Sequence, residues 1–353
     1  MKRLSLLLFF VPTVLCAQTF TVVKDNAHGE IENQCITGTC WSFATVSFLE
    51  SEIIRKGHEA VDLSEMFNAR YIYSKKADSY VRFQGKQQFG PGGLSHDVLQ
   101  VIDEVGMVPE SAYSGFVDGA TTYNHNELDS QLEMIVKGAV EKGAKEGYMW
   151  KKELEAALDA GIGPLPNVFE YKGKKYTPAS FRDEMKIYSN EYVCLTSFKH
   201  HPFDKAFVLE VPDNWSKKAY LNVPLNDLKA IVDNAINNGF TVAWDADVSE
   251  DTFDARKGVA YMGKLQDETA VTQASRQLGF DTYATTDDHL MHITGIAKDE
   301  KGNSYYMAKN SWGSAIGQKG YIYASAPYFL AKTICIVVSR EALPAEIKKR
   351  LGL

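Results

Sequence analysis

The sequence predicts an α+β protein in which helices come first, a further helical section follows and strands come last. One observation is the helical spacing of apolar residues in three stretches, at 39–55, 63–79 and 95–105. The other is a series of apolar β-type runs separated by glycine turns at 240–244, 291–297, 304–309, 320–324 and 333–338. This order differs from the alternation of strands and helices that builds a parallel sheet.

Local signals support the limits of the three helices. Gly57 follows the first helix, Ser64 opens the second and Gly106 follows the third. Residues 119–235 are rich in Lys, Glu and Ala, which predicts a helical insertion with helices at 128–142, 150–160 and 225–237.

Composition bounds the class of protein. The chain has 353 residues, of which 45% are apolar and 24% charged, as in globular proteins. Its net charge of −7 argues against nucleic acid as the main partner, because phosphate binding needs a basic face.

The N-terminus has the layout of a secretory signal peptide. Lys2 and Arg3 precede an apolar run at 4–15, which is too short to span a bilayer. We expect residues 1–17 to be removed and residues 18–353 to be exported to the periplasm or outside the cell, without stable membrane insertion. Lipid attachment at Cys16 is the alternative, although Leu15 is bulkier than such sites prefer.

Cleavage would leave four cysteines, which are too sparse for a disulfide framework, although one bridge could form. Cys40 stands out because it begins a helix, whose positive end favours a thiolate. Gly38 permits a tight turn before it. The side-chain amide of Gln34 and the backbone N–H of Cys40 are expected to stabilise an oxyanion.

A nucleophilic thiol needs a base and a group that orients the base. His289 and His292 lie three residues apart on a predicted strand, so they point to opposite faces. We favour His289, which is at the polar start of the strand, and interpret His292 as a partly buried, hydrogen-bonded residue. Asn310 is expected to orient His289, with Trp312 shielding their bond from water.

No other pattern predicts a bound metal or cofactor. The other histidines lack metal-ligand spacing, and the pair His200 and His201 is interpreted as a solvated loop rather than a zinc site. Neither a P-loop nor a dinucleotide-binding fingerprint occurs.

The order of these motifs resembles that of the papain superfamily, and in detail its bleomycin hydrolase and aminopeptidase C branch. The spacing favours this branch, because His289 lies 249 residues after Cys40 (289 − 40), against about 130–150 in papain-like enzymes. The motifs that carry the resemblance are Asn33-Gln34-x-x-Thr37-Gly38-x-Cys40-Trp41, Leu63-Ser64-Glu65, Gly92-Gly93, Gly106-x-Val108-Pro109, Gly163-Pro164, Tyr220-Leu221-Asn222-Val223-Pro224 and Asn310-Ser311-Trp312-Gly313.

The resemblance implies a papain-like fold, with a helical half carrying Cys40 and a β-barrel-like half carrying His289 and Asn310. It implies peptide hydrolysis through an acyl-thioester at Cys40 and removal of N-terminal residues, since the relatives place their own C-terminus in the cleft. The residues expected to contact substrate are Gly92, Gly93, Asp288, Leu290, Trp312 and, as the terminal carboxylate, Leu353.

Two departures from the family leave alternatives open. The segment before Cys40 is shorter than in hexameric relatives, so a homo-oligomer is possible but a hexamer is doubtful. The C-terminal tail does not clearly match theirs, so an exported endopeptidase with an open cleft is the first alternative to an aminopeptidase. A binding protein that keeps the fold without turnover is the second.

Overall fold

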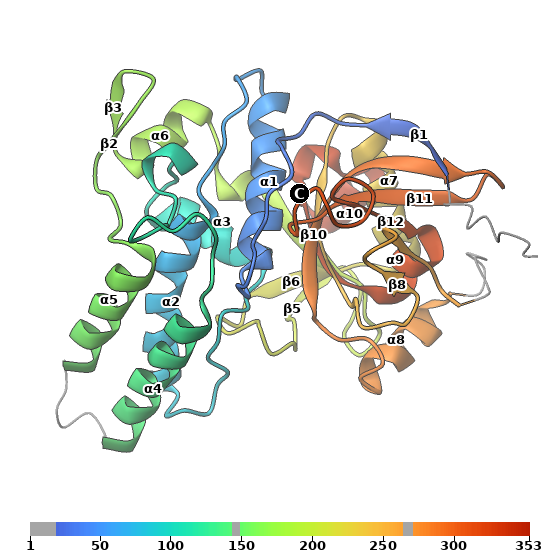
Figure 1. Ribbon diagram of the computed structural model, residues 1–353. Helices are drawn as coiled ribbons and strands as arrows, with labels where there is room; N and C mark the ends of the chain where they lie inside the picture. Colours follow the sequence, from blue (N-terminus) through green and yellow to red (C-terminus); the bar gives the residue numbers. More distant parts are fainter. Residues whose placement is uncertain (1–18, 143–148, 264–270) are drawn as a thin grey trace, which may run out of the picture.

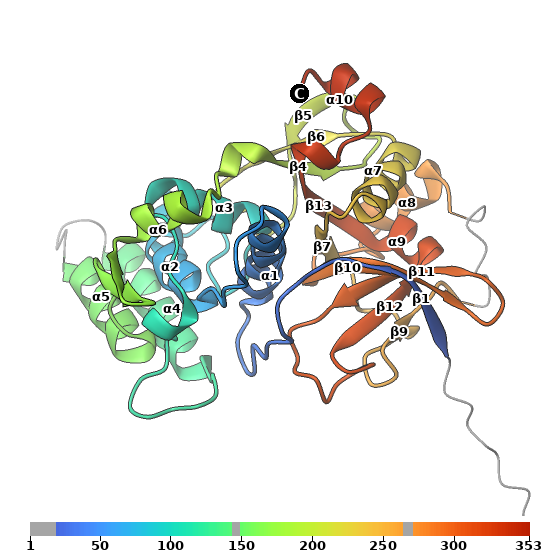
Figure 2. The same cartoon turned by 90° about the horizontal axis from the view of Figure 1, so that it is seen from above.

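The computed structural model describes residues 19–142, 149–263 and 271–353. The chain forms a helical half and a β half, and helix α1 (Cys40–Arg55) lies between them (Figures 1 and 2). The predicted signal peptide lies outside the described residues. No helix in the described ranges has the length and apolar character needed to cross a membrane.

The helical half confirms the three predicted N-terminal helices. The Ser64 side chain accepts a hydrogen bond from the backbone N–H of Phe67 and so caps α2, as its position in the sequence indicated. Besides α1, the helices here are α2 (Glu65–Arg82), α3 (Ser95–Glu104), α4 (Asn126–Lys142), α5 (Met149–Ile162) and α6 (Pro178–Met185).

The β half is built on one mixed sheet with the strand order β5-β6-β4-β13-β7-β10-β11-β12-β9-β8. Helices α7 (Leu225–Asn237), α8 (Gln273–Asp281), α9 (Ala326–Lys332) and α10 (Ala345–Leu351) lie in this half (Figure 2). The strands are β4 (Tyr192–Thr196), β5 (Lys205–Val208), β6 (Ala219–Asn222), β7 (Val242–Ala246), β8 (Phe253–Asp254), β9 (Val259–Ala260), β10 (His289–Asp299), β11 (Ser304–Lys309), β12 (Tyr321–Ser325) and β13 (Thr333–Ser339).

The structure differs from the sequence prediction in two places. Strand β1 (Phe20–Asp25) lies before the first predicted helix, where no strand was predicted, and pairs with β10. The insertion at 119–235 contains the predicted helices, but it also supplies β4–β6 and the hairpin β2 (Phe169–Tyr171) and β3 (Lys174–Tyr176). Strand β4 pairs with β13, which follows it by more than 130 residues, so no local pattern could reveal the pairing.

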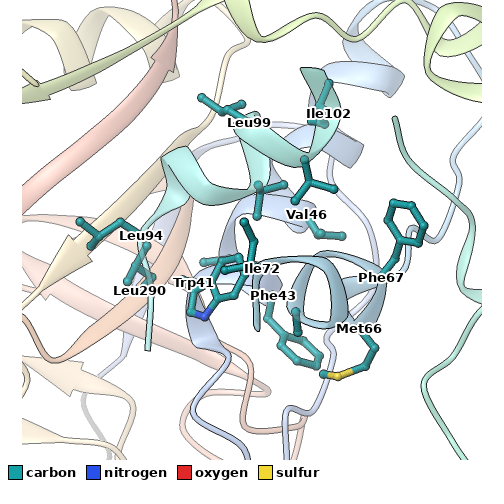
Figure 3. Close-up of a cluster of buried hydrophobic side chains, with 14 of the residues drawn as sticks. Trp41, Phe43, Val46, Met66, Phe67, Ile72, Leu94, Leu99, Ile102 and Leu290 are labelled. Carbon is teal, nitrogen blue, oxygen red and sulfur yellow. The ribbon is translucent and has the colours of Figure 1, made fainter. Parts of the chain in front are cut away.

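Helix α1 is the element that joins the two halves, and nearly all its side chains are buried. It packs against α2 and α3 on one side and against β10 and β7 on the other. Figure 3 shows the apolar part of this contact, where Leu290 of β10 lies beside Leu94 and Trp41. Helix α1 therefore fixes the position of the helical half relative to the β half.

Polar contacts complete the junction between α1 and the sheet. The Ser47 hydroxyl lies 2.9 Å from Nδ1 of His292 on β10 and accepts a hydrogen bond of 2.8 Å from the Lys309 amine on β11. His292 was predicted to be partly buried, but it is completely buried. Its role is to join α1 to β10.

We predict that Gly106→Ala destabilises the protein by about 3 kcal/mol or more, measured by chemical denaturation. Gly106 has φ +109°, and a Cβ there would overlap the backbone of Pro178. The matched control is Gly57→Ala, where φ is +85° but nothing lies within 4 Å. Equal losses in the two variants would show that the contact with Pro178 does not matter.

Candidate active site

Cys40 is the first residue of α1, as the sequence predicted. The residue before it, Thr39, makes no side-chain hydrogen bond to the helix, because its hydroxyl bonds Oγ1 of Thr37 at 2.7 Å. The first turn also contains no acidic residue. The partial positive charge of the helix end therefore acts on the sulfur and on an oxyanion beside it.

His289 is hydrogen bonded to Asn310, and the network around them defines its tautomer. The Asn310 Oδ1 atom accepts from the backbone N–H of Ser311 at 2.8 Å, so this atom must be the amide oxygen. His289 Nε2 lies 2.8 Å from the same oxygen and therefore carries the proton. The other ring nitrogen, Nδ1, is then the base that can accept the thiol proton.

Trp312 covers this pair. Its ring stacks on the His289 ring with the centroids 4.6 Å apart and an interplanar angle of 25°. His289 and Asn310 are each only 4% exposed. The hydrogen bond between them is thus protected from water, which strengthens it.

Gln34 is held in one orientation by Ser311. The Ser311 hydroxyl donates to Gln34 Oε1 at 2.6 Å, and the Gln34 backbone N–H donates to the Ser311 carbonyl at 2.8 Å. One N–H of the Gln34 amide bonds the Thr37 carbonyl at 2.9 Å, so the other remains for an oxyanion. Ser311 thereby positions both Gln34 and Asn310.

Burial makes it unfavourable to charge either the Cys40 thiol or the His289 imidazole alone. It raises the pKa of the Cys40 thiol to about 12, although the backbone N–H of Leu290 acts in the opposite direction. Burial also lowers the pKa of His289 to about 4, although its bond to Asn310 favours the charged form. Burial therefore favours forming a thiolate and an imidazolium together over forming either ion alone.

The loop that contains Gly92 and Gly93 packs on the start of α1. The Trp41 indole donates to the Pro91 carbonyl at 2.9 Å, and a Cβ at Gly93 would lie 3.0 Å from the Trp41 ring. The buried Lys76 amine donates hydrogen bonds to the backbone carbonyls of Gly90 and Gly92. The loop is therefore fixed relative to Cys40.

The remaining predicted contact residues lie in different places. Leu290 is buried, and its backbone N–H reaches the Cys40 thiol. Asp288 is exposed and accepts a hydrogen bond from the Val248 N–H at 3.0 Å, so it supports the loop after β7. Leu353 follows α10 and packs with the apolar cluster around α7, so the structure does not bring it to Cys40.

Among the residues that the structure describes, one group has the spacing to hold a metal ion. The side-chain ligand atoms of His200, His201 and Glu210 all lie within 4.8 Å of one another. However, Nδ1 of His200 faces the amide nitrogen of Gln277 at 2.9 Å, which places the ring proton on Nε2, toward Glu210. The cluster is thus satisfied by hydrogen bonds.

Sequence reasoning missed two residues that support the site. Ser311 lies inside the recognised Asn-Ser-Trp-Gly motif, and its place next to Asn310 was the available signal. Lys76 carried no signal, because a lysine on a helix is ordinarily exposed, whereas this one is 2% exposed. The four cysteines in the described ranges are all free thiols.

Comparison with known proteins identifies the family. The sequence profile described as the peptidase C1-like family matches residues 168–352, just over half of the chain. The chain belongs to the peptidase C1-like family. It is a cysteine peptidase, and Cys40, His289, Asn310 and Gln34 are its candidate catalytic residues.

Individual proteins of known function are similar in sequence to most of this chain. Aminopeptidase C of Streptococcus thermophilus is 24% identical over 375 residues, covering 93% of this chain and 84% of the relative. Human bleomycin hydrolase is 22% identical over 371 residues, covering 90% of this chain and 81% of the relative. Both belong to the branch that the sequence motifs resemble.

A solved structure shows the same fold. The crystal structure of PepW from Lactobacillus rhamnosis HN001 superposes with a TM-score of 0.75 at 20% identity. The match covers 95% of this chain and 85% of that chain. The predicted α+β, papain-like architecture is thus confirmed.

We predict that Gln34→Ala lowers kcat about 10²–10³-fold with little change in KM, because one oxyanion donor is lost. The measurement is steady-state hydrolysis of an aminoacyl coumarin amide. Iodoacetamide labelling of Cys40 is the control, since alkylation forms no oxyanion and should keep its rate. A variant with unchanged kcat would exclude Gln34 as a donor.

Proposed function

We propose that this protein is an aminopeptidase, which removes single residues from the N-terminus of peptides. Cys40 attacks the carbonyl carbon of the first residue while its proton passes to His289 Nδ1. The imidazolium then protonates the leaving amine, and water hydrolyses the acyl-thioester with His289 again acting as base. The relatives named aminopeptidase C, aminopeptidase G and bleomycin hydrolase support this proposal.

The observation that carries the proposal is the position of Asp213. By the family resemblance, a substrate chain runs along Gly92 and Gly93. The Asp213 carboxylate packs directly over Gly92, where even a Cβ would overlap it, and Gln88 holds it there with a hydrogen bond of 2.8 Å. The insertion thus closes the cleft on the side that would take residues preceding the cleaved bond.

The C-terminal tail does not provide this closure here. Arg350 of α10 forms ion pairs with Asp204 and Asp227, which hold the tail against the α7 side of the molecule. Leu353 lies beyond this attachment. The exopeptidase proposal therefore rests on the insertion and not on the terminal carboxylate.

We predict that alanyl coumarin amide is hydrolysed at least about a hundredfold faster, as kcat/KM, than its N-acetylated form. The physical reason is that an acetyl group would meet Asp213. Cys40→Ala is the control for contaminating peptidases. Comparable rates on both substrates would instead identify an endopeptidase.

We also propose that the enzyme is exported, on the basis of the charged and apolar pattern at residues 2–15. Expression of the full chain in a bacterium, followed by cell fractionation and N-terminal sequencing, should yield a mature form that starts near Gln18. A mature form that keeps Met1 in the cytoplasm would contradict export. A lipid-modified N-terminus at Cys16 would indicate the anchored alternative.

A further inference from the structure

Three aspartates surround Cys40 without belonging to the catalytic set. Asp245 lies on β7, Asp287 precedes β10, and Asp213 lies in the insertion. All three are close enough to the thiol to raise the pKa of Cys40. Carboxylates near Cys40 disfavour its reactive thiolate form. We therefore expect these three aspartates to have a different function.

The sheet register places Asp245 next to the catalytic strand. Asp245 pairs with Leu290 across β7 and β10, and its neighbour Ala246 pairs with His289. The Asp213 carboxylate lies over Gly92, and the Asp213 backbone N–H bonds the Asp287 carboxylate. The three carboxyl groups are thus gathered near Cys40 and Gly92.

Asp245 and Asp287 each have one carboxylate oxygen without a donor. The Cys335 thiol lies 3.4 Å from Asp245 Oδ2, and the backbone N–H of Asp213 bonds the Asp287 carboxylate. Asp245 is 1% exposed, and neither its Oδ1 nor Asp287 Oδ2 receives a hydrogen bond from the described residues. In the described part of the chain, no lysine or arginine forms an ion pair with Asp213, Asp245 or Asp287. Burying a carboxylate without a cationic partner or donors is costly.

The pKa shifts of Asp245 and Asp287 also indicate that their negative charges are poorly stabilised. Burial and the neighbouring carboxylates raise the pKa of Asp245 well above its ordinary value and that of Asp287 to about 8. The two groups interact closely enough to share a proton. A cation placed between them and Asp213 would remove both the repulsion and the need for that proton.

Asp287 borders a cavity, although its Oδ2 atom is itself buried. The residue as a whole is only partly buried, and the cavity of about 470 Å³ lies between residues 210–212 and 280–287. Its lining includes Val211, Pro212 and Phe280 and the acidic residues Glu210, Asp281 and Asp287. Of these three acidic residues, Asp287 is the one that comes two residues before His289 in the chain. Asp213 follows Pro212 directly in sequence.

We propose that Asp213 and Asp287, with Asp245 behind Asp287, bind the free α-ammonium group of the peptide substrate. This inference rests on the proposed aminopeptidase function. An ammonium has three N–H donors, which match the carboxylate oxygens available there, and such charge-assisted bonds are strong. The aspartates then take the position that the family resemblance assigns to a C-terminal carboxylate.

The same site could receive another ammonium, the side chain of a lysine in an endopeptidase substrate. Three fluorogenic coumarin amides separate these sources. Alanyl amide carries the α-amine, propionyl amide is the same acyl group without it, and N-acetyl-lysyl-alanyl amide carries only the side-chain amine. Each is assayed with the wild type, Asp213→Asn and Asp287→Asn.

We expect the wild type to prefer alanyl over propionyl amide by about a hundredfold or more. Each variant should lower kcat/KM for alanyl amide about 10–100-fold, mainly through KM, and change the rate on propionyl amide much less. Asp251→Asn, which makes the same chemical change at an exposed position after β7, should alter neither rate. Unimpaired iodoacetamide labelling of Cys40 confirms that the variants are folded.

Two outcomes would overturn the inference while the proposed function stands. One is a wild type that prefers the free amine while both variants retain that preference. The other is loss of the preference on deletion of Gly352 and Leu353, which would assign the amine to the tail. If instead the wild type hydrolyses N-acetyl-lysyl-alanyl amide best and Asp287→Asn removes that activity, the aminopeptidase function itself is wrong.

Discussion

The contact of α1 with strands β10 and β11 is the constraint on which the rest of this structure depends. The nucleophile comes from a helix in one half, and its base from a strand in the other. A thiol and an imidazole exchange a proton only over a hydrogen-bond distance, so the two halves must hold one relative position. Trp41 and Leu290 provide the apolar part of that contact, and Ser47 joins it to His292 and Lys309.

Ser311 extends this control to the chemistry. Its backbone N–H orients the Asn310 amide, and its hydroxyl orients the Gln34 amide. The first contact decides which nitrogen of His289 is the base, and the second directs an N–H toward the oxyanion. Ser311 therefore links proton transfer to transition-state stabilisation. Both depend on a side-chain amide, of Asn310 or of Gln34, whose oxygen and nitrogen must point in the right directions.

In the proposed function, residues 119–235 limit what the cleft can accept. Strands β4–β6 of this segment extend the sheet, and its turn at Asp213 reaches across to Gly92 on the opposite wall. The same turn brings a carboxylate close to Asp287 and Asp245. Asp213 therefore contributes to both parts of the proposal: it limits the cleft at Gly92, and it adds a third carboxylate to the two that come from outside this segment.

The sequence by itself determined the α+β class, the three N-terminal helices and four residues whose types and order are characteristic of this chemistry. Those features depend on local spacing, on capping residues such as Ser64 and on short motifs around Cys40 and Asn310. The pairing of β1 with β10 and of β4 with β13, the burial of Lys76 and the folded-back position of Leu353 were decided only by the tertiary structure. So was the meeting of Asp213, Asp245 and Asp287, because residues distant in sequence have no local pattern that records their contact.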